Sequence, residues 1–233
     1  MNKQAKAGGI DWCDWTWNPL TGCKHGCEYC YARLMAERFR GTPNFPNGFE
    51  PEFHEDRLAE PSLIKKASRI FVCSMADLFG RWVDDKWLVQ VFNAMYAAPQ
   101  HTYILLTKNP GRMTEYMRAA GPNTKVWWGF SASNAKDYHE RHEEMIRVPV
   151  AVRWASIEPL HEAFTPDCAG LRWVVVGAET GRRKGLIVPK AEWVEDIIRC
   201  ARDEDEGLPP RAVFIKKNIP GKWPREYPVE PPQ

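Results

Sequence analysis

The sequence predicts a single α/β domain whose parallel strands curl into an open or partial barrel. Short runs rich in β-branched and aromatic residues alternate with segments whose apolar residues recur at helical spacing. This alternation gives about seven strands and about five helices, and strands joined through helices pair in parallel with right-handed crossovers. A flat doubly wound sheet is the alternative. The domain spans residues 10–219, between a flexible arm at 1–9 and a proline-rich tail at 220–233.

The first half of the chain opens with an aromatic-rich strand at 12–17, which ends at Asn18-Pro19. A helix at 31–40 ends at Gly41, and the proline-rich residues 41–60 predict a long loop that forms part of a lid. The composition then predicts a short helix at 61–68, a buried strand at 69–73, an amphipathic helix capped by Asp84 and a strand at 102–107.

The second half continues the same alternation. Asn109-Pro110 is a cap followed by a first-turn proline, and it opens a helix that ends near Gly121. Residues 160–170 contain no convincing helix, which departs from a regular βα unit. The other predicted elements are strands at 125–130, 151–157, 172–176 and 212–215, a helix from Asn134 to about Arg147, and a helix around 193–201 that is closed by Gly207 and Pro209.

Composition narrows the class of protein. The net charge of +2 is too small to indicate nucleic-acid binding by itself. No apolar run approaches a membrane span, and the polar N-terminus lacks the apolar segment of a secretory signal, so we expect a cytoplasmic protein without a membrane partner. Eleven tryptophans are a high number. They indicate either core packing, which is the commoner use, or a surface on which flat substrates such as bases stack.

Three of the seven cysteines lie within eight residues, as Cys23, Cys27 and Cys30 in C-x3-C-x2-C spacing. Thiolates this close on one loop suit an iron–sulfur cluster or a zinc ion. A closed zinc site needs four ligands, which His25 would complete. A disulfide would leave one thiol over, and an odd number of cysteines with three of them clustered favours a reducing compartment.

The cysteine spacing, with the aromatic Tyr29 just before the last cysteine, resembles the radical SAM superfamily. The resemblance implies a partial (βα)6 barrel, in which Cys23, Cys27 and Cys30 hold three irons of a [4Fe-4S] cluster. The fourth iron is left for S-adenosylmethionine, and Tyr29 packs at its adenine. The resemblance also implies an external one-electron donor, such as a flavodoxin- or ferredoxin-like protein, and a 5′-deoxyadenosyl radical that takes hydrogen from a substrate.

Polar residues follow strand after strand, where a parallel barrel directs them into one mouth. These residues are Asp77, Lys108, Ser131, Ser133, Glu158, Glu179 and Lys216. By charge, Glu158, Glu179 and Lys216 are candidate catalytic groups at this mouth. Cys73, at the end of a strand, is either a donor of a hydrogen atom to a product radical, as in some relatives, or simply a small buried residue.

The resemblance assigns cofactor roles to the remaining residues. Lys108 and Asp77 are candidates for the carboxylate and amine of S-adenosylmethionine, with help from Ser74, although the stretch Cys73-Ser-Met-Ala-Asp77 replaces the superfamily's usual Gly-Gly-Glu-like sequence. Ser131 and Ser133 follow a strand at the position where the superfamily often places residues that bind the ribose hydroxyls of S-adenosylmethionine. Gly177 opens a turn that either lets backbone approach the adenine or is a plain glycine turn.

Motifs along most of the chain also resemble a compact phage-encoded group of three-cysteine proteins of largely unassigned function. The motifs are Trp15-Thr-Trp-Asn-Pro19, Thr21-Gly-Cys23, Met75-Ala-Asp-Leu-Phe79, Leu106-Thr-Lys-Asn-Pro110, Ser156-Ile-Glu-Pro-Leu160, Gly177-Ala-Glu-Thr-Gly181 and Phe214-Ile-Lys-Lys217. A phage setting makes a nucleobase in phage DNA or other nucleic acid the first substrate hypothesis.

Basic residues give this substrate hypothesis modest support, because lysine and arginine hold phosphates while an aromatic ring stacks on a base. They are Arg182, Arg183, Lys184, Lys216, Lys217, Lys222 and Arg225, with Trp223 among them. Two alternatives stay open. One is a radical SAM enzyme that acts on a peptide or a small metabolite, and the other is a non-catalytic zinc or iron–sulfur module that grips nucleic acid.

Overall fold

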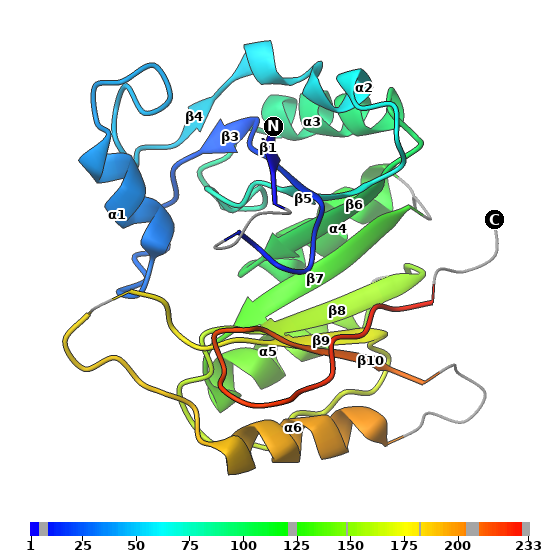
Figure 1. Cartoon of the computed structure of the whole chain (residues 1–233). Helices are drawn as coiled ribbons and strands as arrows, with labels where there is room; N and C mark the ends of the chain where they lie inside the picture. Colours follow the sequence, from blue (N-terminus) through cyan, green and yellow to red (C-terminus); the bar gives the residue numbers. More distant parts are fainter. Residues whose placement is uncertain (5–8, 121–124, 148, 182, 204–209, 230–233) are drawn as a thin grey trace. The chain divides into compact units, whose positions relative to one another are not determined.

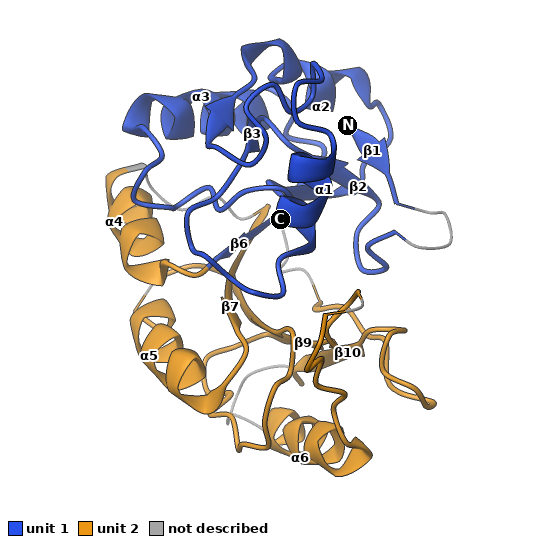
Figure 2. Cartoon of the chain, turned by 90° about the vertical axis from the view of Figure 1, so that its left-hand side faces the viewer, with its two compact units in different colours: residues 1–107 blue, residues 108–233 orange. Residues whose placement is uncertain are grey.

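The structure is a computed structural model that describes residues 1–4, 9–120, 125–147, 149–181, 183–203 and 210–229. The chain forms two compact units, Met1–Thr107 and Lys108–Gln233 (Figure 2). Each unit contains its own set of mostly parallel strands with helices (Figure 1). The predicted α/β class is therefore confirmed.

The sheet of the first unit has the strand order β1-β2-β5-β6. Its strands are β1 (Asn2–Lys3), β2 (Trp15–Trp17), β5 (Arg69–Val72) and β6 (Thr102–Thr107). β2, β5 and β6 are parallel, whereas β1 pairs antiparallel with β2 and so ties residues 2–3 of the predicted arm to the sheet. Residues 5–8 of that arm lie outside the described residues.

Two short strands next to the cysteine loop differ from the prediction. β3 (Leu20–Thr21) pairs antiparallel with β4 (Glu52–Phe53), and η1 (Glu55–Arg57) follows. Residues 41–60, predicted as a long loop, therefore contain some regular structure. The prediction missed it because two-residue strands are too short to show a period of two in the sequence. The predicted helix at 61–68 is the single turn α2 (Glu60–Leu63).

Two longer helices of the first unit begin as the sequence predicts. α1 (Tyr31–Arg38) begins directly after Cys30. α3 (Asp85–Tyr96) is capped by Asp84, whose carboxylate accepts a hydrogen bond from the Lys86 N–H. The apolar face of α3 is buried, as the helical spacing of Leu88, Val91, Phe92 and Met95 requires.

Among the described residues of the second unit, four parallel strands lie in the order β7-β8-β9-β10. They are β7 (Val126–Ala132), β8 (Val152–Ile157), β9 (Trp173–Val176) and β10 (Ala212–Ile215). The helices are α4 (Pro110–Ala120), α5 (Ala135–Met145) and α6 (Ala191–Arg202). α5 packs on β7 and α6 on β10. Gly207 and Pro209, predicted to close the last helix, lie outside the described residues, as does Gly121.

Tryptophans fill the core of the second unit. The side chains of Trp127, Trp128, Trp154 and Trp173 are fully buried on β7, β8 and β9. The ring of Trp173 lies 5.4 Å from that of Trp127 and 5.0 Å from that of Trp154, between ring centroids. Core packing therefore accounts for these four rings, and they are not available as a stacking surface.

The C-terminal residues up to 229 run along the edge of β10. The Ile215 N–H donates to the Pro224 carbonyl and the Glu226 N–H donates to the Val213 carbonyl, both at 2.9 Å. This extended segment satisfies an edge strand that would otherwise present unpaired backbone groups. None of the helices in the described part of the chain has both the length and the apolar character needed to cross a membrane.

Gly129, in the middle of β7, provides a test of this packing. A Cβ atom at this position would lie 2.2 Å from the Trp154 ring. We expect Gly129→Ala to lower the free energy of unfolding by about 1–3 kcal/mol, because the buried indole has no room to move. Urea denaturation followed by tryptophan fluorescence measures the change. Gly111→Ala in α4 is the control, since its nearest neighbour is the flexible Glu144 carboxylate at 3.2 Å. Equal midpoints for the two variants would contradict the packing argument.

Candidate functional site

The cysteine loop starts at Gly22, directly after β3. Gly22 has a φ of +84°, and a Cβ atom there would lie 2.1 Å from the Glu50 carbonyl oxygen, so only glycine fits. The Gly22 N–H donates to the Met75 carbonyl at 3.0 Å, and the Cys23 N–H donates to the Phe49 carbonyl at 3.3 Å. These contacts fix the start of the loop between two segments that are distant in sequence.

The end of the loop is fixed by helix α1. Cys30 is the N-cap residue, and its Sγ accepts a hydrogen bond from the Arg33 N–H at 3.4 Å. A helix N-terminus favours negative charge, so this position suits a thiolate. Cys23, Cys27 and Cys30 are partly exposed and take part in no disulfide. Cys23 and Cys30 pack against a small cluster formed by Ala32, Ala36, Phe49 and Met75.

The Cys23 thiol responds to its surroundings in the loop. Burial is the main cause that raises the pKa of the Cys23 thiol to about 12, and a hydrogen bond from the His25 backbone opposes it. The charges of Asp77, Cys27 and Cys30 raise this pKa further. A site that gathers mutually repelling thiolates needs positive charge, which iron or zinc ions supply when they displace the protons.

The geometry of the donor set bears on the kind of metal centre. Within the described ranges, no group of three or more His, Cys, Asp and Glu side chains is placed to hold one metal ion. A [4Fe-4S] cluster does not need such convergence, because each thiolate binds a different iron. Three free thiols on one anchored loop therefore fit a cluster, with Cys23, Cys27 and Cys30 as the residues that would hold it.

Asp77, predicted near the amine of S-adenosylmethionine, is a buried hub of hydrogen bonds. Its Oδ1 accepts from the Thr107 hydroxyl at 2.6 Å and from the Phe79 N–H at 3.0 Å. Its Oδ2 lies 2.7 Å from Nε2 of His25, in the middle of the cysteine loop. Asp77 thus connects the loop to the end of β6, and a role toward a ligand stays a prediction.

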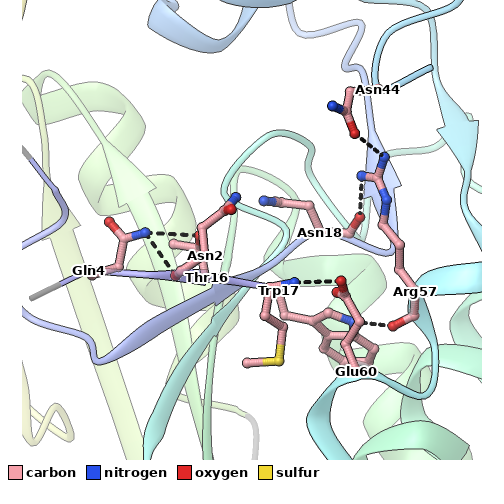
Figure 3. A network of polar contacts seen from close by, with 9 residues as sticks. Asn2, Gln4, Thr16, Trp17, Asn18, Asn44, Arg57 and Glu60 are labelled. Atoms are coloured by element: carbon pink, nitrogen blue, oxygen red, sulfur yellow. Dashed lines mark hydrogen bonds and ion pairs between the residues drawn. The ribbon is translucent and has the colours of Figure 1, made fainter. Parts of the chain in front are cut away.

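Ser74 lies beside the cysteine loop and is positioned by Asn18. The Asn18 Oδ1 accepts from the Ser74 hydroxyl at 3.1 Å and from the Met75 N–H at 3.0 Å. The Tyr31 hydroxyl donates to the Ser74 carbonyl at 2.9 Å, while the nearby Tyr29 is half-buried. On its other side, the Asn18 carbonyl accepts from the Arg57 guanidinium at 3.1 Å (Figure 3).

Cys73 is 3% exposed and has a φ of +60°, which is uncommon for a residue other than glycine. Its N–H donates to the Trp17 carbonyl at 2.8 Å. Burial raises the pKa of its thiol to about 12, so the sulfur keeps its proton at neutral pH. A protonated thiol is compatible with both predicted roles, the donor of a hydrogen atom and the small buried residue.

In the second unit, the structure brings Glu158 and Lys216 together. They follow β8 and β10, and the Lys216 Nζ donates to the Glu158 Oε1 in an ion pair whose side chains are 24% and 16% exposed for Glu158 and Lys216. A Cβ atom at Gly177 would lie 2.8 Å from the Glu158 carboxyl carbon and 2.9 Å from the Lys216 Cδ. The ion pair therefore leaves no room for a side chain at position 177. This reason for the glycine was not identified from the sequence.

Lys108 and the two serines predicted as cofactor ligands also lie in the second unit. The Lys108 Nζ donates to the Ser131 hydroxyl at 3.1 Å, and the Arg141 guanidinium donates to the Ser131 carbonyl at 2.6 Å. Ser133 is buried, and its carbonyl accepts from the His161 N–H at 3.1 Å. Of the predicted ligands for the cofactor's carboxylate and ribose, Lys108 and Ser131 are thus in contact.

Glu179 is held by partners that sequence reasoning did not identify. Its side chain is 1% exposed and makes two hydrogen bonds with Arg183, at 2.8 and 2.9 Å, and lies 3.3 Å from Nε2 of His161. The Arg183 guanidinium is the main cause that holds the pKa of Glu179 below its usual range. A carboxylate engaged in this way anchors a loop. A substrate would have to displace Arg183 or His161 before Glu179 could act as a catalytic group, and that role stays a prediction.

Several of the predicted phosphate-binding residues have partners within the protein. Arg183 binds Glu179, Lys216 binds Glu158, and the Arg225 guanidinium lies 4.8 Å from the centre of the Phe214 ring. The Trp223 Nε1 donates to the Pro220 carbonyl at 2.9 Å. Arg182 lies outside the described residues. These paired basic residues therefore do not identify a nucleic-acid surface by themselves.

The Glu179 contacts predict a pH-dependent stability. Glu179→Gln keeps the shape but removes the charge that Arg183 binds, and we expect a loss of about 1–3 kcal/mol at pH 7. Because the folded-state pKa is lowered, this contribution is present above the unfolded value and disappears as the pH falls through the folded value. Urea denaturation at pH 7, 5 and 3 should show the difference from wild type shrinking. Glu195→Gln, at an exposed position of α6, is the control. A constant difference across this range would contradict the assignment.

Comparison with solved structures finds a similar fold. A mutant of spore photoproduct lyase, solved with dinucleoside spore photoproduct, superposes with a TM-score of 0.51 at 12% identity, over 83% of this chain and 62% of that one. Another structure, "Spore photoproduct lyase complexed with dinucleoside spore photoproduct", gives 0.49 at 11% identity, over 82% and 62%. The chain thus spans about three fifths of the length of these structures. The first of these likenesses shows that the chain is similar in fold to a radical SAM enzyme.

Sequence comparison gives a family but no characterised relative. No curated protein matches the chain. A family model matches residues 7–207, which include the cysteine loop, strands β2 to β9 and the Glu158 and Glu179 segments. The chain therefore belongs to the family described as "Protein of unknown function (DUF5131)".

Proposed function

We propose that this chain is a radical SAM enzyme that acts on a nucleobase or an already modified nucleotide in DNA. The observation that carries the proposal is the cysteine loop, with three free thiols anchored between β3 and α1. The fold likeness to spore photoproduct lyase, solved with a dinucleoside photoproduct, supports both the chemistry and the substrate class. The resemblance to a phage group makes phage DNA the first substrate to test.

Cys23, Cys27 and Cys30 would hold a [4Fe-4S] cluster and leave one iron for S-adenosylmethionine. When bound, the pair would supply radical chemistry, namely reductive cleavage of S-adenosylmethionine with one electron and removal of a hydrogen atom from the substrate. A flavodoxin- or ferredoxin-like protein supplies the electron. The chain's own residues then bind the ligands, exclude water and direct the reaction to one carbon.

The residues of the second unit offer complementary groups. Lys108 presents an ammonium group beside the Ser131 hydroxyl, which suits a carboxylate next to a ribose. Glu158 and Lys216 place an acceptor and a proton donor side by side, with Gly177 leaving space for them. A base inside a duplex must be flipped out to reach such groups. Cys73 keeps an S–H that is able to return a hydrogen atom to a product radical.

Anaerobic reconstitution with iron and sulfide tests the cluster. We expect a brown protein with about four irons per chain, which releases 5′-deoxyadenosine from S-adenosylmethionine when dithionite is added. Cys23→Ala, Cys27→Ala and Cys30→Ala should each lose the cluster, because each removes the thiolate of one iron. Cys200→Ala, a half-buried cysteine on α6, is the matched control and should keep it. A colourless protein with one zinc would show a non-catalytic metal-binding module instead.

The substrate class is tested by the yield of 5′-deoxyadenosine. Phage DNA, ultraviolet-irradiated DNA, free nucleosides and peptides are added in turn to the reconstituted protein. Only the correct class should raise the yield and acquire a new mass. A rise with peptides and none with nucleic acid would replace the nucleobase by a peptide substrate.

Glu158 provides a test in the second unit. We expect Glu158→Gln to keep the full iron content but to lower turnover by about 100-fold or more, because a positioned proton acceptor is lost. Iron analysis and product formation are measured on the same preparation. Glu162→Gln is the control, since Glu162 is exposed on the same segment and accepts from the Ala135 N–H, which glutamine also does. Unchanged turnover in Glu158→Gln would remove Glu158 from the site.

A further inference from the structure

Trp82 lies in the segment between β5 and α3, and its ring position is narrowly defined. A Cβ atom at Gly80 would lie 2.4 Å from the six-membered ring of Trp82. The indole thus packs directly on the backbone two residues earlier, where only a glycine leaves room. The Gly80 N–H donates to the Asp77 carbonyl, and the Val83 N–H donates to the Gly80 carbonyl, so consecutive turns hold this segment.

The indole N–H of Trp82 is buried and has no hydrogen-bond partner among the described protein atoms. Three other tryptophans of the described chain place this donor on a protein acceptor. The N–H groups of Trp17, Trp173 and Trp223 each donate to a backbone carbonyl at 2.8 to 2.9 Å. A buried donor without an acceptor costs about 1–3 kcal/mol, so such a group indicates an acceptor that the protein does not itself provide.

The surroundings of Trp82 show where that acceptor belongs. Its ring meets the His25 ring edge to face, with 4.9 Å between the centroids. His25 is the central residue of the cysteine loop, between Cys23 and Cys27, and its Nε2 is held at 2.7 Å by the buried Asp77. Trp82 therefore contacts the central residue of the loop that carries the three thiols, and Asp77 holds that same residue.

We propose that the Trp82 indole N–H donates a hydrogen bond to a sulfur atom of the iron–sulfur cluster held by Cys23, Cys27 and Cys30. The inference rests on the proposed function, since it needs that cluster. A donor directed at a cluster sulfur stabilises the extra negative charge of the reduced form, which raises the reduction potential. Trp82 is thus a residue that tunes the cluster and that no motif of the sequence singles out.

The test is the midpoint potential of the reconstituted cluster without S-adenosylmethionine, titrated with dithionite and followed by electron paramagnetic resonance. We expect Trp82→Phe, which keeps an aromatic ring but lacks the N–H, to shift the potential to more negative values. The matched control is Trp87→Phe. Trp87 belongs to α3 and its ring stacks on Phe53, a residue outside the cysteine loop, with 5.5 Å between centroids, so the potential of Trp87→Phe should equal that of wild type.

A second measurement uses the wild-type protein and so does not depend on whether Trp82→Phe folds. Wild-type protein with ¹⁵N in the tryptophan indoles should show, by pulsed double resonance, an exchangeable proton and a nitrogen coupled to the reduced cluster. Trp87→Phe should keep this coupling. If Trp82→Phe folds poorly, as circular dichroism and thermal unfolding would reveal, the wild-type coupling alone decides.

The outcomes separate this inference from the proposed function. A wild-type protein that binds no iron–sulfur cluster overturns both, and iron analysis identifies that case. A wild-type cluster with no coupled indole and an unchanged potential in Trp82→Phe overturns the role of Trp82 alone. A shift that appears only after S-adenosylmethionine is added would overturn it as well, because the N–H would then serve the cosubstrate.

Discussion

The buried carboxylate of Asp77 is the contact on which the cysteine loop depends. A carboxylate removed from water must have its oxygens hydrogen-bonded, and each donor here comes from a different segment. Thr107 ends β6, the Phe79 N–H closes the turn after β5, and His25 belongs to the loop itself. These three contacts therefore position the cysteine loop and the strand ends of the first unit together.

The second unit solves the same problem by pairing charges. The polar residues after its strands are predicted to point into one mouth; the structure pairs two of them, Glu158 and Lys216, and pairs Glu179 with Arg183. Paired groups are cheaper to keep half-buried than single ones. A ligand that contacts Glu158 or Lys216 must therefore compete with an existing ion pair or bind to the pair as a unit, and binding to the pair requires both a donor and an acceptor on the ligand.

How far the sequence predicts this structure depends on how local each feature is. The strands at 102–107 and 212–215 are found at their predicted bounds, because buried apolar runs between turn residues carry their own signal. The spacing of the three cysteines is equally local. The His25–Asp77 contact spans 52 residues, and no spacing rule reports it. The need for glycine at position 177 is non-local as well, because the side chains that leave no room there, Glu158 and Lys216, lie far away in the sequence.

The choice between a four-iron cube and a single zinc ion turns on His25. A histidine bound to a carboxylate is also what many zinc ligands look like, so the Asp77 contact alone is compatible with zinc. A tetrahedral site, however, draws three sulfurs and a nitrogen to within about 2.3 Å of one point. No such convergence exists among the described residues, although the loop is fixed at both ends by Gly22 and Cys30. In a cube each thiolate binds its own iron, so the sulfurs need not meet at one point, and cluster sulfides as well as metal-bound thiolates are acceptors for the buried Trp82 N–H.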